Sequence, residues 1–271
     1  MRPADVDRTE LERFLRRSAP VHPYALADLD DALFPDVRFY ATRKSDGELE
    51  ALCLVLDELE LPIVYAVAPP GDPATLALLR ELEPSLPERF YANLPVGGGD
   101  ALRPARALAP RGVHAKMWLA EPAALDCAEP AGLVSLGPEH ADELAEFYAT
   151  RAYAPSEREG RFFARSMLEP FPWLGVRERG QLVAVAGLHV FSRRYGVAAL
   201  ANVATEPAHR GRGLARALCA RLARELLRHV PLVGLNCAVD NAPARRCYLG
   251  LGFRDALRYE EAGVTRADAP V

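Results

Sequence analysis

A glycine-rich turn between an apolar strand and a long amphipathic helix constrains the fold of this chain most strongly. The strand is expected to end at Thr205, and the turn Arg210-Gly-Arg-Gly213 leads directly into a helix predicted at about 212–229. One face of this helix carries leucines at every fourth position, Leu214, Leu218, Leu222 and Leu226. Such a stripe has to pack against a core, so the segment predicts an α/β fold in which helices cover a mixed sheet.

The turn has the properties of an anion-binding site. The first amides of a helix have no acceptor within the helix, and the helix dipole adds partial positive charge there. Gly211 and Gly213 allow a phosphate to approach the backbone closely, and Arg210 and Arg212 add positive charge. No Lys-Ser or Lys-Thr pair follows, as it would in a P-loop, and Arg216 replaces the third glycine of a dinucleotide-binding motif. The alternative is an ordinary helix start with a solvated arginine face.

The remaining sequence predicts two halves of similar layout, each with three consecutive strands followed by a helix. In the first half we expect strands at 37–43, 49–57 and 62–68, a helix with Asp72 as its N-cap, and a strand at 112–120. In the second half we expect a strand at 133–138, a helix at 138–152, strands at 173–180, 181–192 and 195–205, the helix at 212–229, a strand at 232–239, a helix at 241–249 and a strand at 253–261. A linker at 121–132 separates the halves, so we predict two α/β domains, 1–125 and 131–271.

Composition and charge exclude several classes of protein. No apolar run reaches the length of about 18 residues that a membrane helix needs, and the charged N-terminus lacks a signal-peptide core, so we expect a cytoplasmic location and no membrane partner. The five cysteines form no CxxC pair and do not cluster with histidines, so no metal site is expected. A net charge of −4 argues against a nucleic-acid partner. Basic residues predominate only after residue 130, which favours an anionic ligand in the second half.

Two blocks of the second half resemble the GNAT superfamily of acyl-CoA-dependent N-acetyltransferases. Arg210-x-x-Gly213-x-Ala215 is similar to the family signature Arg/Gln-x-x-Gly-x-Gly/Ala, and it lies between a strand and the main helix. The segment from Asn241 to Phe253 resembles the family's ending Asn-x-x-Ala-x-x-x-Tyr-x-x-x-Gly-Phe. The resemblance covers about 131–271 and implies a GNAT-like catalytic domain. The first half is then expected to be a degenerate GNAT-like domain, in a tandem layout similar to the mycothiol synthase-like and glycine N-acyltransferase-like branches.

The resemblance also implies where acetyl-CoA, or another acyl-CoA, would bind. In such enzymes the fourth and fifth strands splay apart and the co-substrate lies between them. The backbone of Val203, Ala204 and Thr205 would then bind the pantetheine arm, and Asn241 would contact the co-substrate from the other side. The diphosphate would be held by the turn and the start of the helix, at Arg210, Gly211, Arg212, Gly213, Leu214 and Ala215. Tyr248 would lie near the thioester sulfur as the general acid.

The chemistry of amine acylation agrees with a tyrosine in this role. A phenol with an ordinary pKa of about 10 stays protonated at neutral pH and can protonate a leaving thiolate, whose conjugate thiol has a pKa of about 8.5. A general base is harder to assign, because the strand AALANVAT contains no acid and Asn202 stands where a carboxylate would be convenient. Glu206 follows in the turn, where we expect it to be solvated. His189 on the preceding strand is the titratable candidate, and loss of the amine proton to solvent is the alternative.

The acceptor is expected to be a primary amine of a small molecule or a peptide. The family places acceptor contacts at about 147–173, where the candidates are Tyr153, Arg158, Arg161, Phe162, Phe171 and Trp173. We expect an N-acetyltransferase in which the amine attacks the thioester directly. The sequence is compatible with a homodimer but does not determine the oligomeric state. Two alternatives remain: a non-catalytic acyl-CoA-binding sensor or regulatory module, which would share the same turn, and an ATP-using enzyme of the P-loop type.

A second glycine run, Gly97-Gly98-Gly99-Asp100, lies in the first half. No strongly apolar strand leads into it and no basic residue adjoins the glycines. We therefore expect a turn in which Asp100 caps the next helix, with a second nucleotide-binding loop as the alternative.

Overall fold

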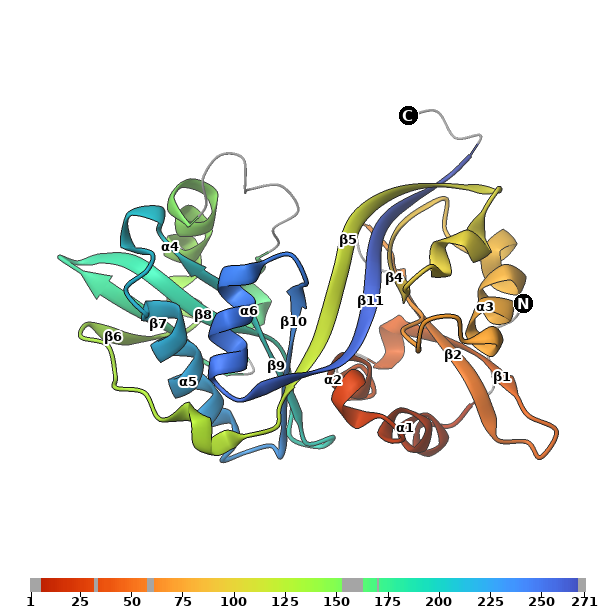
Figure 1. Cartoon of the computed structure of the whole chain (residues 1–271), viewed down its shortest axis with the longest axis horizontal. Helices are drawn as coiled ribbons and strands as arrows, with labels where there is room; N and C mark the ends of the chain where they lie inside the picture. The colour runs from red at the N-terminus through yellow and green to blue at the C-terminus, as the bar shows by residue number, and fades with distance from the viewer. Residues whose placement is uncertain (1–5, 32–33, 58–60, 153–162, 170, 268–271) are drawn as a thin grey trace. The chain divides into compact units, whose positions relative to one another are not determined.

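The computed structural model describes residues 6–31, 34–57, 61–152, 163–169 and 171–267, and Figure 1 shows its helices and strands. The chain forms two compact units. The first unit comprises Met1–Met117, Cys237–Asn241 and Asp255–Val271, and the second comprises Trp118–Asn236 and Ala242–Arg254. The last strand of the chain therefore belongs mainly to the first unit.

The second unit is built on a mixed sheet with the strand order β10-β9-β8-β7-β6. Four strands pair antiparallel, and they are β6 (Leu133–Leu136), β7 (Trp173–Glu178), β8 (Gln181–Ser192) and β9 (Val197–Thr205). Strand β10 (Leu232–Ala238) runs parallel to β9. The helices are α4 (Ala141–Glu146), α5 (Leu214–Leu226) and α6 (Ala242–Gly250). This arrangement confirms the predicted mixed α/β sheet fold.

Helix α5 owes its position to the leucine stripe found in the sequence. All four leucines of the stripe are buried, and α5 packs against β8 and β9. Burial of each leucine side chain contributes about 1.5–3 kcal/mol to folding. Because the helix begins directly after Gly213, this packing also places the glycine-rich turn at the end of β9.

The strands of the first unit follow the order β1-β2-β3-β4-β11-β5, and they are also of mixed direction. These strands are β1 (Val37–Arg43), β2 (Leu49–Leu56), β3 (Ile63–Tyr65), β4 (Arg89–Pro95), β5 (Arg106–Leu119) and β11 (Phe253–Arg266). Strands β1, β2 and β3 form an antiparallel meander, β4 runs parallel to β3, and β11 pairs antiparallel with β4. The helices are α1 (Arg8–Arg16), α2 (Pro23–Ala27) and α3 (Pro73–Leu82).

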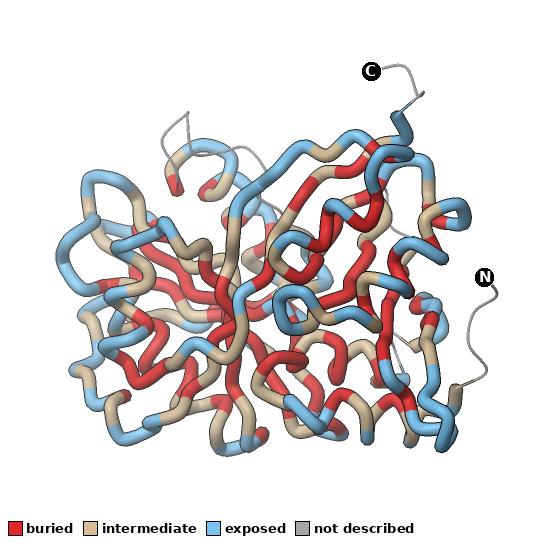
Figure 2. Tube along the Cα trace, turned by 45° about the vertical axis from the view of Figure 1, so that its right-hand side comes forward, coloured by how far each residue is buried: buried red, intermediate tan, exposed pale blue. Residues whose placement is uncertain are grey.

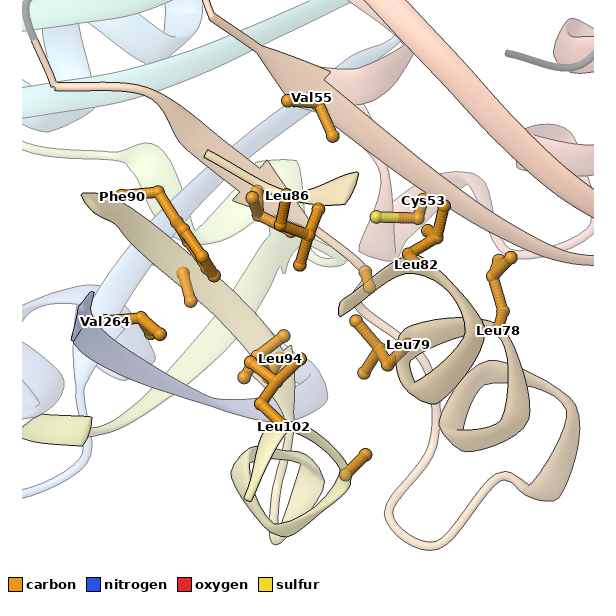
Figure 3. Packing of buried hydrophobic residues seen from close by; sticks show 14 of the residues in the cluster. Cys53, Val55, Leu78, Leu79, Leu82, Leu86, Phe90, Leu94, Leu102 and Val264 are labelled. Carbon is orange, nitrogen blue, oxygen red and sulfur yellow. The ribbon is translucent and has the colours of Figure 1, made fainter. Parts of the chain in front are cut away.

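The core of the first unit lies between α3 and one face of its sheet. Figure 3 shows Leu79 and Leu82 of α3 in one cluster with Phe90 and Leu94 of β4. Figure 2 shows the buried positions in the interior of the trace and the exposed positions mainly at its outer turns. Asp72 caps α3 as predicted, because its carboxylate accepts a hydrogen bond of 2.8 Å from the amide of Thr75. The negatively charged carboxylate of Asp72 therefore occupies the place at the start of α3 where an external anion would bind.

Several elements differ from the expectations drawn from the sequence. Strand β3 is shorter than the expected 62–68, β5 begins at Arg106 and not at 112, and β11 runs to Arg266 and not to 261. Strand β4 is not predicted, although Phe90, Ala92 and Leu94 alternate toward the core, because the small Ala92 and the polar Asn93 weaken the apolar pattern. The helix expected at 138–152 is interrupted. Helix α4 ends at Glu146, and a π-helical turn follows at Phe147–Arg151. Such turns depend on packing and frequently mark functional sites.

The amides of the glycine run in the first unit are hydrogen-bonded to a carboxylate of the same unit. The amides of Gly97 and Gly99 donate hydrogen bonds of 2.9 and 2.7 Å to the carboxylate of Glu260 on β11. The short 3₁₀-helix Gly98–Leu102 has Gly97 at its N-cap, so the expectation that Asp100 caps this helix is wrong. The expected absence of a preceding strand is also wrong, since β4 leads into the run.

Both units share one order of elements, β-β-β-α-β. In the first unit this order is β1-β2-β3-α3-β4, and in the second it is β7-β8-β9-α5-β10. In each case the strand after the helix pairs in parallel with the strand before it. Within the described residues, no helix has the length and apolar character that a membrane crossing requires.

Candidate active site

Strands β9 and β10 of the second unit pair over only part of their length. Their register runs from Val197↔Leu232 to Leu200↔Leu235 and ends there, although β9 continues to Thr205. On its other edge β9 still pairs with β8 as far as Thr205. The stretch that holds Val203, Ala204 and Thr205 is therefore hydrogen-bonded on one edge and without β10 on the other. An unpaired strand edge presents amides and carbonyls to an extended ligand.

The start of α5 lies directly beyond this stretch and has free amides. Gly211 and Gly213 both adopt a φ of +78°, a left-handed conformation that glycine accepts readily. Nothing lies within 4 Å of where a Cβ would stand on either residue, so the space beside the turn is open. The described part of the chain provides no hydrogen-bond acceptor for the amides of Gly211, Gly213 and Leu214. These amides and the helix dipole make a site that fits a phosphate group.

The arginines of the turn already have partners within the protein. The guanidinium of Arg212 makes two hydrogen bonds to the carboxylate of Glu178 on β7, at 3.1 and 2.5 Å. This contact lowers the pKa of Glu178 and raises that of Arg212. Arg210 donates to the carbonyls of Thr205 (3.1 Å) and Ala152 (3.4 Å). The expected positive charge of Arg212 is thus largely balanced, and the anion site depends mainly on backbone amides.

His209 links two carboxylates beside the same turn. Its Nδ1 lies 3.0 Å from Glu206, and its Nε2 lies 3.5 Å from Glu178. Glu206 is therefore held by a neighbour and is not simply solvated, as the sequence suggested. Glu178 and His209 are not found by sequence reasoning, since nothing local indicates that β7 reaches the turn.

Two buried polar atoms lie on the stretch where β9 and β10 are apart, one on β10 directly after the last paired residue and one at the end of β9. The hydroxyl oxygen of Thr205 and the amide oxygen of Asn236 on β10 are buried and have no hydrogen-bond partner among the described residues. Buried polar atoms are satisfied in most native structures, so these two oxygens are available to an ordered water or a ligand. Asn236 is a further site candidate that the sequence did not indicate.

Strand β9 carries a bulge at Asn202, where the φ of +51° is unusual for a residue other than glycine. The pairing with β8 shifts there, between Val185 and Gly187. The carbonyl of Asn202 accepts a short hydrogen bond of 2.5 Å from the hydroxyl of Tyr148, on the π-helical turn. This contact ties the bulge to the segment in which acceptor contacts are expected.

Tyr248 lies on α6 and is 9% exposed, with its ring against Phe253 at a centroid distance of 6.1 Å. Burial keeps its phenol away from bulk solvent, which suits a proton donor. Asn241 precedes α6 and belongs to the first unit, where its amide donates to the carbonyl of Ala238 (3.1 Å). The roles of both residues stay predictions.

His189, the candidate base, is exposed on β8, where the pairing with β9 shifts between Leu188 and Val190. Its role stays a prediction too. Of the expected acceptor residues, Tyr153, Arg158, Arg161 and Phe162 lie outside the described part of the chain. Phe171 packs against Phe191 at 5.1 Å, and the indole of Trp173 is buried and donates to the carbonyl of Met167 (3.0 Å). These contacts give Phe171 and Trp173 a packing role.

The second unit thus combines a mixed sheet that parts between β9 and β10 with a glycine-rich start of α5. Residues 130–253 match the model of the Acetyltransferase (GNAT) family. Comparison with curated proteins gives no match. In the described residues, no group of three or more His, Cys, Asp or Glu side chains is placed to hold a metal ion.

Solved structures share the fold over nearly the whole chain. A tandem GNAT protein from the clavulanic acid biosynthesis pathway is 17% identical, with 100% of this chain and 98% of that chain covered and a TM-score of 0.59. A Drosophila protein is 18% identical, with coverage of 95% and 87% and a TM-score of 0.64. A GCN5-related N-acetyltransferase from Kribbella flavida is 18% identical, with coverage of 92% and 96% and a TM-score of 0.56. At these identities the likeness concerns the fold alone.

Proposed function

We propose that the second unit is an acyl-CoA-dependent N-acyltransferase that moves an acetyl group from acetyl-CoA to a primary amine. The observation that carries this proposal is the start of α5, where free amides and two open glycines adjoin the unpaired end of β9. The match of this segment to a family of acetyltransferases supports it.

The donor would be held mainly by backbone groups of the second unit. The amides from Gly211 to Ala215 would bind the diphosphate, because they lack acceptors and lie at the positive end of α5. The edge of β9 at Val203–Thr205, which β10 does not pair, would bind the amide groups of the pantetheine arm as an additional strand would, with the Thr205 carbonyl shared with Arg210. The unpartnered oxygens of Thr205 and Asn236 offer two further hydrogen bonds on this path.

Tyr248 would supply the proton that the departing thiolate needs. The amine nitrogen forms a bond to the acyl carbon, the carbon–sulfur bond breaks, and the sulfur takes the proton of the phenol. The proton released by the amine balances this step, and it leaves through His189 or directly to solvent. Positioning of the two reactants contributes further to the rate.

The acceptor would approach the bulge of β9 as an amine of a small molecule or a peptide. Tyr148 holds the Asn202 carbonyl, which keeps this part of the strand in one conformation. We infer that the pair positions the reacting groups and takes no proton, because neither residue is an acid or base at neutral pH.

A panel of amines tests the proposal, with release of free CoA as the readout. The expected result is amine-dependent release that requires acetyl-CoA. The absence of a carboxylate on β9 favours a second candidate, a non-catalytic acyl-CoA sensor. Thermal stabilisation by acetyl-CoA without release across the panel would support the sensor, whereas stabilisation by ATP–Mg alone would contradict both.

A further inference from the structure

The first unit encloses the side chain of Lys116 in a cage of three tyrosine rings. Lys116 lies on β5 and is 2% exposed. Its Nζ is 4.8 Å from the ring centroid of Tyr24, 4.9 Å from that of Tyr65 and 4.4 Å from that of Tyr259. These rings, here called the tyrosine cage, come from α2, β3 and β11. Ring faces attract cations within about 6 Å, and desolvation strengthens the attraction.

Carboxylates surround the cage without a direct ion pair to Lys116. Glu261 accepts a hydrogen bond of 2.6 Å from the hydroxyl of Tyr259, and Tyr91 donates to its other oxygen. No carboxylate among the described residues lies within ion-pair distance of the Lys116 amine. The three ring faces are therefore the groups that contact this amine at these distances, while Glu261 and Asp28 act on it through their charge.

Burial and neighbouring charges act in opposite directions on the charged form of Lys116. Burial lowers the pKa of Lys116 to about 7, while Glu261 and Asp28 oppose this shift. Burial also raises the pKa of Asp28 to about 7. Burial, followed by the charge of Lys116, lowers the pKa of His22 to about 3, so His22 is neutral beside the hydroxyl of Tyr65 at 3.2 Å.

We propose that the tyrosine cage is an amine-binding pocket of the first unit and that Lys116 occupies it as an internal ligand. The pocket accepts a primary alkylamine with a short unbranched chain, the shape of the lysine side chain itself. It is closed to amines from solution as long as Lys116 is present. This inference depends on the first unit alone and not on the function proposed for the second.

Removal of the internal ligand tests the pocket. Lys116→Ala removes three carbons and the nitrogen beyond Cβ, which together have the shape of n-propylamine. We expect n-propylamine to raise the unfolding temperature of this variant and leave that of the wild type unchanged. Its dissociation constant, measured by calorimetry, should be at least about tenfold lower than that of 1-propanol, the neutral molecule of equal length.

Met117→Ala is the matched control, since Met117 is the next buried residue on β5 and points to the opposite face. The cavity in this control should not prefer the amine to the alcohol. Equal binding of both probes to Lys116→Ala, or the same amine preference in the control, would overturn the proposal. If Lys116→Ala does not fold alone, refolding in n-propylamine but not in 1-propanol supports the pocket, and refolding that does not discriminate between them overturns it.

The wild-type chain offers a second test, because Lys44 and Lys116 are its two lysines. In a chain labelled with ¹³C-lysine, the ε-methylene protons of Lys116 should be shifted upfield by the three rings. Lys44 is exposed and should give the ordinary shift. Two ordinary signals would contradict the cage itself, whether or not the variant folds.

Discussion

Two strand-to-helix junctions occupy equivalent places in the two units, and they differ in what fills the helix start. Helix α3 begins after Asp72, whose carboxylate accepts the amide hydrogen of Thr75. Helix α5 begins after Gly213, which has no side chain and leaves the first amides free. The first junction thus contains its own anion, whereas the second has room for one from outside. One fold can therefore carry a closed and an open form of the same feature.

The strands beside these junctions differ in how far they stay paired. Strands β3 and β4 pair up to the end of β3, at Tyr65↔Asn93, and the amide of Ala66 extends the pairing to the carbonyl of Asn93. Strands β9 and β10 part after Leu200↔Leu235, well before β9 ends. In the first unit the strands stay paired and the helix start is capped, so we call it the closed unit. In the second unit the strands part and the helix start has free amides, so we call it the open unit and assign acyl-CoA binding to it alone.

The largest expected effect comes from giving α5 the charge that α3 already has. Gly213→Asp places a carboxylate beside the free amides, where it satisfies them and repels a diphosphate. We expect the affinity for acetyl-CoA to fall at least about 100-fold, which corresponds to about 2.8 kcal/mol, as measured by isothermal titration calorimetry. Gly213→Asn is the control, since asparagine tolerates positive φ and carries no charge. Equal losses in both variants would assign the effect to the backbone and not to charge.

The next effect concerns catalysis in the open unit. Tyr248→Phe removes the proposed proton donor, so kcat should fall by about 100-fold while the dissociation constant of acetyl-CoA changes little. Tyr195→Phe, a buried tyrosine between β8 and β9, controls for loss of a phenol and should keep full turnover. Turnover at the wild-type rate in Tyr248→Phe would remove this tyrosine from the mechanism.

A smaller effect is expected in the closed unit. Asp72→Ala removes the cap of α3, which should lower the free energy of unfolding by about 1 kcal/mol in urea titrations. The affinity for acetyl-CoA should not change, because this junction binds no co-substrate. Asp7→Ala, at the cap of α1, provides a comparable loss of a cap for reference. An altered affinity in Asp72→Ala alone would contradict the assignment of binding to one unit.

The smallest effect concerns the charge beside the open junction. Glu178→Gln releases the guanidinium of Arg212 and removes a negative charge near the anion site, so the KM for acetyl-CoA should fall by about threefold at low salt. Glu143→Gln breaks the neighbouring pair with Arg177, on the other face of β7, and should leave KM unchanged. A higher KM in Glu178→Gln would instead mean that the ion pair holds the turn in its binding conformation.

Local patterns predicted much of both units. The leucine stripe of α5 and the cap at Asp72 were predicted correctly, because helix periodicity and capping depend on residues close in sequence. Strand β4 was missed, and the place of β11 beside β4 could not be predicted. That pairing joins segments far apart in the chain, and no local signal encodes it.

In the candidate site, too, the features that depend on neighbouring residues were predicted and those that join distant segments were not. The turn at Gly211 and Gly213 is visible in the sequence, since it needs particular residues at particular spacings. The pairing of Arg212 with Glu178, the unpartnered oxygen of Asn236 and the contact of Tyr148 with Asn202 each join distant segments. These features require the tertiary structure.

The number of CoA molecules bound per chain tests most directly whether only the second unit binds the co-substrate. Calorimetric titration of the wild-type chain with CoA should give one site per chain, because, of the two parallel strand pairs described, only β9–β10 parts beside a helix start with free amides. A stoichiometry of two would show that the first unit also binds CoA, and the absence of binding would contradict the role given to the start of α5.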